Sequence, residues 1–215
     1  MKHKALLVAV LSILAAVALV GTRRVFSREP LAIAPSSPSG LADRKPKAYL
    51  ASPFGFSEAG KSFYNGTLVA LVKDSGFETL DPWTLTPANL IDPILSLHSL
   101  DARRAAWMKV NPIIGQNNAA AIRRCDVVVA GLDGSDVDSG TASEIGYAAA
   151  LGKIIIGYRS DFRQAGDNEG AVVNLQVEYF IRQSGGDIYG SALLLGQALK
   201  KLRGRLPASG GRGRG

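Results

Sequence analysis

The stretch that decides the fold class runs Asp126-Val-Val-Val-Ala-Gly-Leu-Asp-Gly-Ser-Asp-Val-Asp-Ser-Gly-Thr-Ala-Ser-Glu144. Its apolar part, residues 127–132, is typical of a strand that is buried on both faces of a parallel sheet. A helix is predicted from about Thr141 to Leu151, because Gly152 supplies a C-terminal stop signal. Three aspartates and two glycines lie between these elements, so a polar loop joins the buried strand directly to the helix.

The chain on both sides of this stretch repeats the order of strand and helix. Strands are predicted at 47–52, 77–80, 126–132 and 154–158, and helices at 57–76, 99–108, 113–124, 174–182 and 191–202. Such alternation predicts an α/β fold, in which helices cover both faces of a parallel sheet.

Two polar segments follow strands of this predicted sheet. They are Ser52-Pro-Phe54-Gly-Phe56 and the loop 133–144 that contains Gly140. Ligands of open parallel sheets bind outside the carboxyl ends of the strands, and glycines let the backbone approach a ligand closely. We therefore expect the ligand to contact Ser52, Phe54 and Gly140.

Glu144 has two interpretations at this stage. Thr141-Ala-Ser-Glu144 matches a capping box, in which the glutamate accepts a hydrogen bond from the backbone amide of the cap residue. Alternatively, the helix N-terminus favours an ionised carboxylate, which at the ligand edge can attack an electrophilic carbon. Asp138 lies six residues earlier, across Gly140, so the loop can aim both acids into one cleft. The residues alone leave both interpretations open.

Composition excludes several classes of site. The 215 residues contain one cysteine and two histidines, which excludes an internal disulfide framework, a cysteine-based metal cluster and a multi-histidine metal site. We predict no metal and no cofactor. The net charge of +7 comes from the two ends, because residues 29–199 hold 14 basic and 18 acidic residues. The central domain is therefore mildly acidic, and no specific nucleic-acid partner is predicted.

The sequence divides into four predicted parts. Residues 1–28 form a hydrophobic segment with an apolar run from Ala5 to Gly21, which as a helix spans about 26 Å. Residues 29–46 are a Pro/Ser-rich linker, 47–204 the domain, and 205–215 a disordered Gly/Arg tail. We expect the first part to contact the membrane as an uncleaved anchor, with the domain on the cytoplasmic side. A cleaved signal, or a mis-assigned start codon that leaves a soluble cytoplasmic protein, are the alternatives.

Four segments together resemble the nucleoside 2-deoxyribosyltransferase family. They are Tyr49-Leu-Ala-Ser-Pro-Phe54, Cys125-Asp-Val-Val-Val-Ala130, Asp138-Ser-Gly-Thr-Ala-Ser-Glu-Ile-Gly-Tyr-Ala148 and Leu151-Gly-Lys-Ile-Ile-Ile-Gly-Tyr-Arg159. The resemblance extends from about Lys47 to Leu202 and implies a Rossmann-like, flavodoxin-type sheet. It also implies an enzyme that needs no metal or redox cofactor.

The resemblance implies roles for individual residues. Glu144 matches the nucleophilic glutamate that attacks C1′ of the deoxyribose, Tyr49 the tyrosine that holds this carboxylate, and Asp138 the aspartate that binds the nucleobase. Asn174 matches an asparagine that, in oligomeric members, helps to bind the sugar across a subunit boundary. Asn118 stands where some members have a proton-donating aspartate, and an amide cannot titrate in that role. Phe54, Phe56 and Trp83 are candidates to stack on the base or to pack in the core.

The expected function is transfer of a 2-deoxyribosyl group between nucleobases through a covalent glycosyl-glutamate intermediate. The expected partners are a deoxynucleoside, a free nucleobase and further copies of the chain. A first alternative is hydrolysis of the N-glycosidic bond in 2′-deoxynucleosides or their 5′-monophosphates, where water replaces the acceptor base. A second alternative is a non-catalytic sensor that binds nucleosides.

Overall fold

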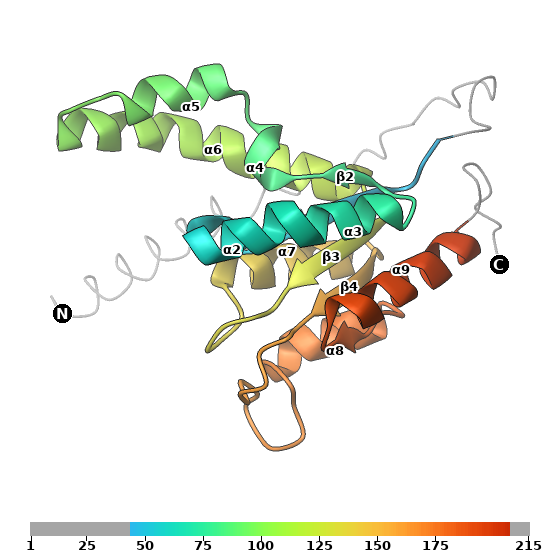
Figure 1. Cartoon of the computed structure of the whole chain (residues 1–215). Helices are drawn as coiled ribbons and strands as arrows, with labels where there is room; N and C mark the ends of the chain where they lie inside the picture. The colour runs from blue at the N-terminus through green and yellow to red at the C-terminus, as the bar shows by residue number, and fades with distance from the viewer. Residues whose placement is uncertain (1–43, 207–215) are drawn as a thin grey trace, which may run out of the picture. The chain divides into compact units, whose positions relative to one another are not determined.

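The computed structural model describes residues 44–206, in which five parallel strands form one sheet (Figure 1). The strands are β1 (Lys47–Ala51), β2 (Glu78–Leu80), β3 (Val127–Gly131), β4 (Ile154–Tyr158) and β5 (Ile188–Tyr189), in the order β2-β1-β3-β4-β5. This order is that of flavodoxin-type sheets and confirms the predicted α/β fold. Tyr49 pairs with Val128, so β1 and β3 lie side by side where the order of strands reverses.

Helices cover both faces of the sheet. One face carries α2 (Glu58–Phe63), a π-helical turn η2 (Tyr64–Leu68), α3 (Val69–Asp74) and α9 (Ala192–Arg205). The other carries α4 (Pro82–Leu85), α6 (Leu100–Arg124), α7 (Ser139–Ala150) and α8 (Leu175–Gln183). Each face has its own apolar cluster, and the middle of β3 is fully buried between them. The short 3-10 helix η1 (Phe54–Phe56) follows β1, and α5 (Ala88–Leu95) packs on α6.

The structure corrects the prediction between residues 82 and 124. The two helices predicted at 99–108 and 113–124 are one continuous helix, α6, which passes through Pro112. Proline lacks the N–H that would bond to the carbonyl of Met108, but Met108 is 75% exposed and water can satisfy that carbonyl. The helices α4 and α5 and the two-residue strand β5 were not predicted.

Helix α7 begins two residues before its predicted start, because Asp138 and not a later residue is its N-cap. Helix α9 extends to Arg205, one residue into the predicted tail. No helix within residues 44–206 is long and apolar enough to span a bilayer. The predicted hydrophobic helix of segment 1–28, most of the linker, and residues 207–215 lie outside the described part of the chain.

Candidate active site

A pocket of roughly 520 Å³ opens at the carboxyl edge of the sheet, beside the junction of β1 and β3. It is bounded by the segment after β1, the first turn of α7, the α4 region and the inner face of α6. Its principal lining residues are Ser52, Phe56, Trp83, Trp107, Asn111, Ile114, Asn118, Asp138, Gly140, Thr141 and Glu144. The loops after β1 and β3, which the sequence predicted as the ligand edge, therefore meet in one cavity.

Tyr49 and Glu144 form the central polar contact of this pocket. The Tyr49 side chain is fully buried in β1, and its hydroxyl donates a 2.6 Å hydrogen bond to Oε1 of Glu144. Burial raises the pKa of Glu144 above its ordinary value, the Tyr49 hydrogen bond opposes this rise, and the negative charge of Asp138 adds to it. Burial and the neighbouring carboxylate also raise the pKa of Tyr49, which keeps its phenol protonated as a donor.

The first turn of α7 settles the two interpretations of Glu144 in part. Asp138 is the N-cap, since its Oδ2 accepts a 2.9 Å hydrogen bond from the amide of Thr141. Thr141 therefore lies inside the helix, and the predicted capping box is not formed. The Glu144 side chain takes no part in capping the helix and accepts a hydrogen bond from Tyr49 instead. A Cβ on Gly140 would lie 3.0 Å from Asp138 Oδ2, so glycine at this position leaves room for the capping carboxylate.

Two aromatic rings and an amide also line the pocket. Trp83 and Phe56 meet edge to face with their ring centroids 4.9 Å apart, and both line the pocket. The Oδ1 atom of Asn118 is buried and accepts no hydrogen bond from any residue of the described chain. A buried acceptor without a donor costs free energy, so this oxygen is suited to a donor group on a ligand. Ser52 lines the same pocket, and its Oγ accepts a hydrogen bond from the amide of Phe54.

Two residues predicted to bind substrate lie outside the pocket. The Phe54 ring packs edge to face on Phe63 and Tyr158 in the apolar cluster on the opposite face of the sheet. Phe56, two residues later, lines the pocket in its place. Asn174 is the N-cap of α8, where its Oδ1 accepts hydrogen bonds from Gln176 and Val177. A sugar contact by Asn174 within the same chain therefore has no geometric support.

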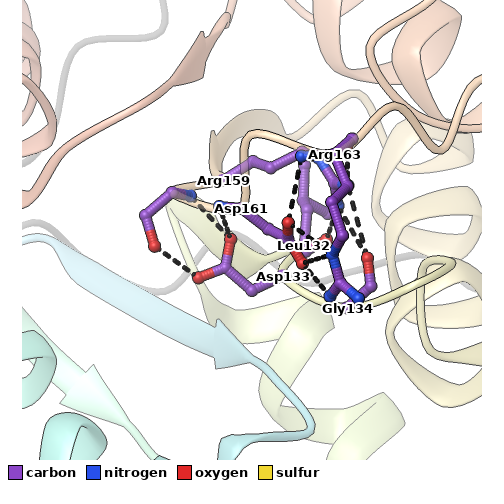
Figure 2. Close-up of polar contacts among 7 residues, drawn as sticks. Leu132, Asp133, Gly134, Arg159, Asp161 and Arg163 are labelled. Carbon is purple, nitrogen blue, oxygen red and sulfur yellow. Dashed lines mark hydrogen bonds and ion pairs between the residues drawn. The ribbon is translucent and has the colours of Figure 1, made fainter.

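Figure 2 shows the side chains that join the loop after β3 to the loop after β4. The guanidinium of Arg159 is buried and donates to the carbonyl oxygens of Leu132, Gly134 and Arg163. Asp133 in turn accepts from the backbone amides of Ser160 and Asp161, at 2.6 and 2.9 Å. This network fixes the start of the loop that ends at Asp138.

Asp161 and Arg163 complete the network at the surface. Arg163 binds Asp161 through several hydrogen bonds, which hold the pKa of Asp161 well below its usual range. Arg163 is exposed to solvent, so the pair contributes to the shape of the loop more than to stability.

Sequence reasoning missed three lining residues on α6, namely Trp107, Asn111 and Ile114. With Asn118 they follow the spacing i, i+4, i+7 and i+11, which places all four on one helical face. This spacing is present in the sequence. It was missed because the helix was predicted as two separate helices on either side of Pro112.

Cys125 does not belong to the site. Its thiol is buried in the apolar cluster under α6 and does not line the pocket, and burial raises its pKa to about 11, which suits neither a nucleophile nor a metal ligand. Among residues 44–206, no three His, Cys, Asp or Glu side chains gather in a way that would hold a metal ion.

Comparison with known proteins defines the family. The sequence model of nucleoside 2-deoxyribosyltransferases matches residues 48–176, and the chain belongs to this family. The match contains Tyr49, Asn118, Asp138, Glu144 and Asn174. The chain is therefore an enzyme that acts on nucleosides, by transfer of the sugar or by cleavage of the N-glycosidic bond. No curated protein matches it.

Solved structures resemble the chain at low identity. A conserved protein from Enterococcus faecalis V583 is 24% identical with a TM-score of 0.55, over 74% of this chain and 99% of that one, and it supports the fold. A 2-desoxiribosyltransferase from Leishmania mexicana is 25% identical with a TM-score of 0.47, over 74% and 97%. A CMP N-glycosidase from Clostridium botulinum is 22% identical with a TM-score of 0.40, over 73% and 97%.

Proposed function

We propose that the protein transfers a 2-deoxyribosyl group between nucleobases, with Glu144 as the nucleophile. The observation that carries this proposal is the 2.6 Å hydrogen bond from the buried Tyr49 hydroxyl to Glu144 Oε1 inside the pocket. This bond fixes the orientation of the carboxylate and leaves Oε2 to attack. Because the carboxylate is half-buried rather than hydrated, less water must be displaced when it approaches a sugar carbon.

The reaction follows from this geometry. Cleavage of the N-glycosidic bond builds positive charge at C1′, and the Glu144 carboxylate stabilises that charge and then bonds to C1′. The base leaves with the bonding electron pair and takes up a proton. Asp138 is the other titratable residue of the lining, so the proton comes from Asp138 or from solvent. A ring nitrogen of a second base then attacks C1′, which breaks the bond to the carboxylate, and the proton of that nitrogen passes to Asp138 or to solvent.

The aromatic rings and the amide of the pocket lining support recognition of a base. Trp83 and Phe56 offer aromatic surface on which a planar ring can stack, and the unpartnered Asn118 Oδ1 can accept a hydrogen bond from an N–H group of that ring. Asp138 retains Oδ1, the carboxylate oxygen not used for capping, for a second N–H group. The two acceptors favour a base that presents donors on its edge.

The charge of the lining favours nucleosides over their 5′-monophosphates. The lining includes two carboxylates, Asp138 and Glu144, and no lysine or arginine from the described residues. Arg159 is a buried cation that directly follows β4 at this edge of the sheet, but its guanidinium donates to backbone carbonyl oxygens. A phosphate would therefore meet like charge without a cation to bind it.

The proposal includes two features of the whole chain. We infer that it forms a homo-oligomer in which Asn174 serves the pocket of a neighbouring subunit, since Asn174 lies outside its own. We also infer that residues 1–28 attach the enzyme to a membrane with the domain on the cytoplasmic side, on the strength of the apolar run from Ala5 to Gly21.

Product analysis tests the function. The full chain is incubated with a 2′-deoxynucleoside, with and without a second free base, and the products are separated. A new deoxynucleoside that forms only with the second base supports transfer. Free deoxyribose formed at the same rate in both mixtures would establish hydrolysis instead, and no turnover would favour a sensor.

A pair of glutamate variants tests the nucleophile. Glu144→Ala should abolish turnover and the sugar adduct seen by mass spectrometry of the intact protein. Glu58→Ala removes another glutamate from the first turn of a helix, α2, and should leave both unchanged. Normal turnover of folded Glu144→Ala protein would disprove the assignment.

A further inference from the structure

The edge of the sheet opposite the pocket carries a cluster of exposed cations. The strands begin at this edge and α3, α6 and α9 end there, on the right-hand side of Figure 1. We call the cluster the basic edge and define it by six exposed residues, Lys45, Lys73, Arg124, Lys200, Lys201 and Arg205. None of the six forms an ion pair with another residue of the described chain.

Acidic residues do not neutralise the basic edge. Of the acids near the starts of the strands, Asp126 is paired with Arg44 and Glu78 with Lys47. Asp187, which precedes β5, is paired with Arg182, so among residues 44–206 Asp74 is left at this edge to balance the six cations. Acids outnumber cations at the pocket edge, where Asp81, Asp133, Asp136, Asp138, Glu144 and Asp161 follow the strands together with the cations Arg159 and Arg163. Residues 44–206 hold 18 basic and 16 acidic residues, so their net charge is small, but the two signs are unevenly distributed along the direction of the strands.

Helix dipoles explain part of this arrangement. Cations stabilise the carboxyl end of a helix, which accounts for Lys73, Arg124 and Arg205 in the last turns of three helices. The dipole gives no reason for Lys45, which precedes a strand, or for Lys200, which lies more than a turn before the end of α9. A partner with negative charge would account for the whole cluster.

The course of the chain indicates which partner. β1 begins at Lys47 on the basic edge, so the polypeptide that carries the apolar run 5–21 enters the domain there. The carboxyl end of α9 lies at the same edge, and Arg212 and Arg214 follow it in the sequence. In the order of the sequence, the chain that follows the apolar run thus joins the domain at the edge that carries the cations. This combination is typical of proteins that contact a bilayer with anionic headgroups.

We propose that the basic edge docks the domain on an anionic lipid surface, with the pocket facing away from the bilayer. Each exposed lysine or arginine near such a surface strengthens the attraction, and the five residues of β1 separate the two edges by roughly 17 Å. The acidic pocket edge would be repelled by the same lipids, so the charge distribution selects one orientation. This inference rests on the proposed membrane attachment of residues 1–28 and does not depend on which reaction the pocket catalyses.

A probe on each edge tests the proposal with the full chain reconstituted in vesicles. Gly204→Cys places a dye on the basic edge, where a Cβ meets no atom within 4 Å, and Ala59→Cys places it on exposed α2 near the pocket edge. Buried Cys125 is replaced by alanine to prevent labelling. With phosphatidylglycerol in the vesicles, a lipid-borne quencher should quench the dye at position 204 and not that at 59. Pure phosphatidylcholine should give little quenching at either position.

Matched charge reversals identify the residues responsible. Lys73→Glu, Lys200→Glu and Lys201→Glu together should lower the quenching at position 204 at least about tenfold. Lys61→Glu, Arg104→Glu and Lys109→Glu make the same change of charge away from the basic edge and should leave it unchanged. If the first triple variant does not fold, the Gly204→Cys protein without charge reversals is measured at high salt, which should abolish quenching of its dye.

Three results would overturn the proposal. The first is equal quenching of the dye at position 204 in neutral and anionic vesicles. The second is stronger quenching of the dye at position 59 than at position 204, and the third is an equal loss of quenching in both triple variants. Displacement of the domain from anionic vesicles by a short single-stranded RNA, at a concentration below that of accessible anionic lipid, would assign the basic edge to nucleic acid instead.

Discussion

Tyr49→Phe should move the acid limb of the activity profile to higher pH. The substitution removes only the hydroxyl that donates to Glu144 Oε1, and the ring keeps its place in the buried strand. A hydrogen bond to a charged group is worth about 1.5–3 kcal/mol, or roughly 10- to 160-fold in an equilibrium. This bond lowers the pKa of Glu144 against the rise caused by burial, so its loss raises that pKa further.

The sign of the effect follows from the role of the carboxylate. In the proposed mechanism only ionised Glu144 can attack C1′, so activity should fall as the pH drops through the pKa of Glu144. On that limb Tyr49→Phe should lose roughly 10- to 160-fold of kcat/KM, and the loss should shrink as the pH rises. The assay is release of free base from a deoxynucleoside across a pH series, with circular dichroism as the check of folding.

Tyr64→Phe is the matched control. Tyr64 is also a buried tyrosine, and its hydroxyl donates a 2.7 Å hydrogen bond to a carboxylate, that of Asp81. Because Asp81 is not the nucleophile, this variant should leave the acid limb in place. An acid limb that stays fixed or moves to lower pH in Tyr49→Phe would refute the argument, as would an equal shift in both variants.

Four further substitutions have expected outcomes. Asp138→Asn removes the negative charge that raises the pKa of Glu144, so the acid limb should move to lower pH while base binding and turnover weaken; unchanged preference among bases would contradict this. Glu144→Gln should raise Tm at neutral pH and leave it unchanged in acid. The reason is that the pKa of Glu144 is higher in the folded than in the unfolded chain, so the native protein loses stability as the pH rises from the unfolded pKa through the folded pKa. A lower Tm of the variant at neutral pH would contradict this. Arg159→Met leaves the buried carbonyl oxygens that the guanidinium binds without a donor. It should lower the free energy of unfolding by about 3 kcal/mol, which calorimetry should detect as a fall in Tm of roughly 6–12 °C. Gly55→Ala places a Cβ 2.0 Å from the Trp83 ring and should raise KM about fivefold, a loss of about 1 kcal/mol of stacking, whereas an unchanged KM would remove Trp83 from base binding.

The sheet could be predicted from sequence because its strands are strongly patterned. β3 and β4 are almost continuous apolar runs bounded by polar residues, and the structure confirms both within one or two residues. β5 has only two residues, Ile188 and Tyr189, too few for a periodic signal. Its place at the sheet edge is set by pairing with β4, which is a tertiary interaction that no local pattern encodes.

The site could be predicted only in part for a similar reason. The acids after β3 were found because a polar loop follows a buried strand, but the contact of Tyr49 with Glu144 joins residues 95 positions apart. The resemblance to the family supplied that pair, whereas the residues alone also allowed a capping box. Phe54 and Phe56 were equivalent in sequence, and only the turn after β1 directs the second of them to the pocket.

The continuity of α6 through Pro112 has a consequence for how this enzyme can change. Glu144 and Tyr49 are held by the sheet and its adjoining helix α7, whereas Trp107 and Asn111 lie on the amino-terminal half of α6, which packs against α5. In the proposed mechanism, the part of the base-binding wall that lies on α6 and the nucleophile thus have separate supports. Substitutions along one face of α6 can alter which bases are accepted while the nucleophile keeps its geometry, so new substrate ranges are reachable by single steps that each preserve activity.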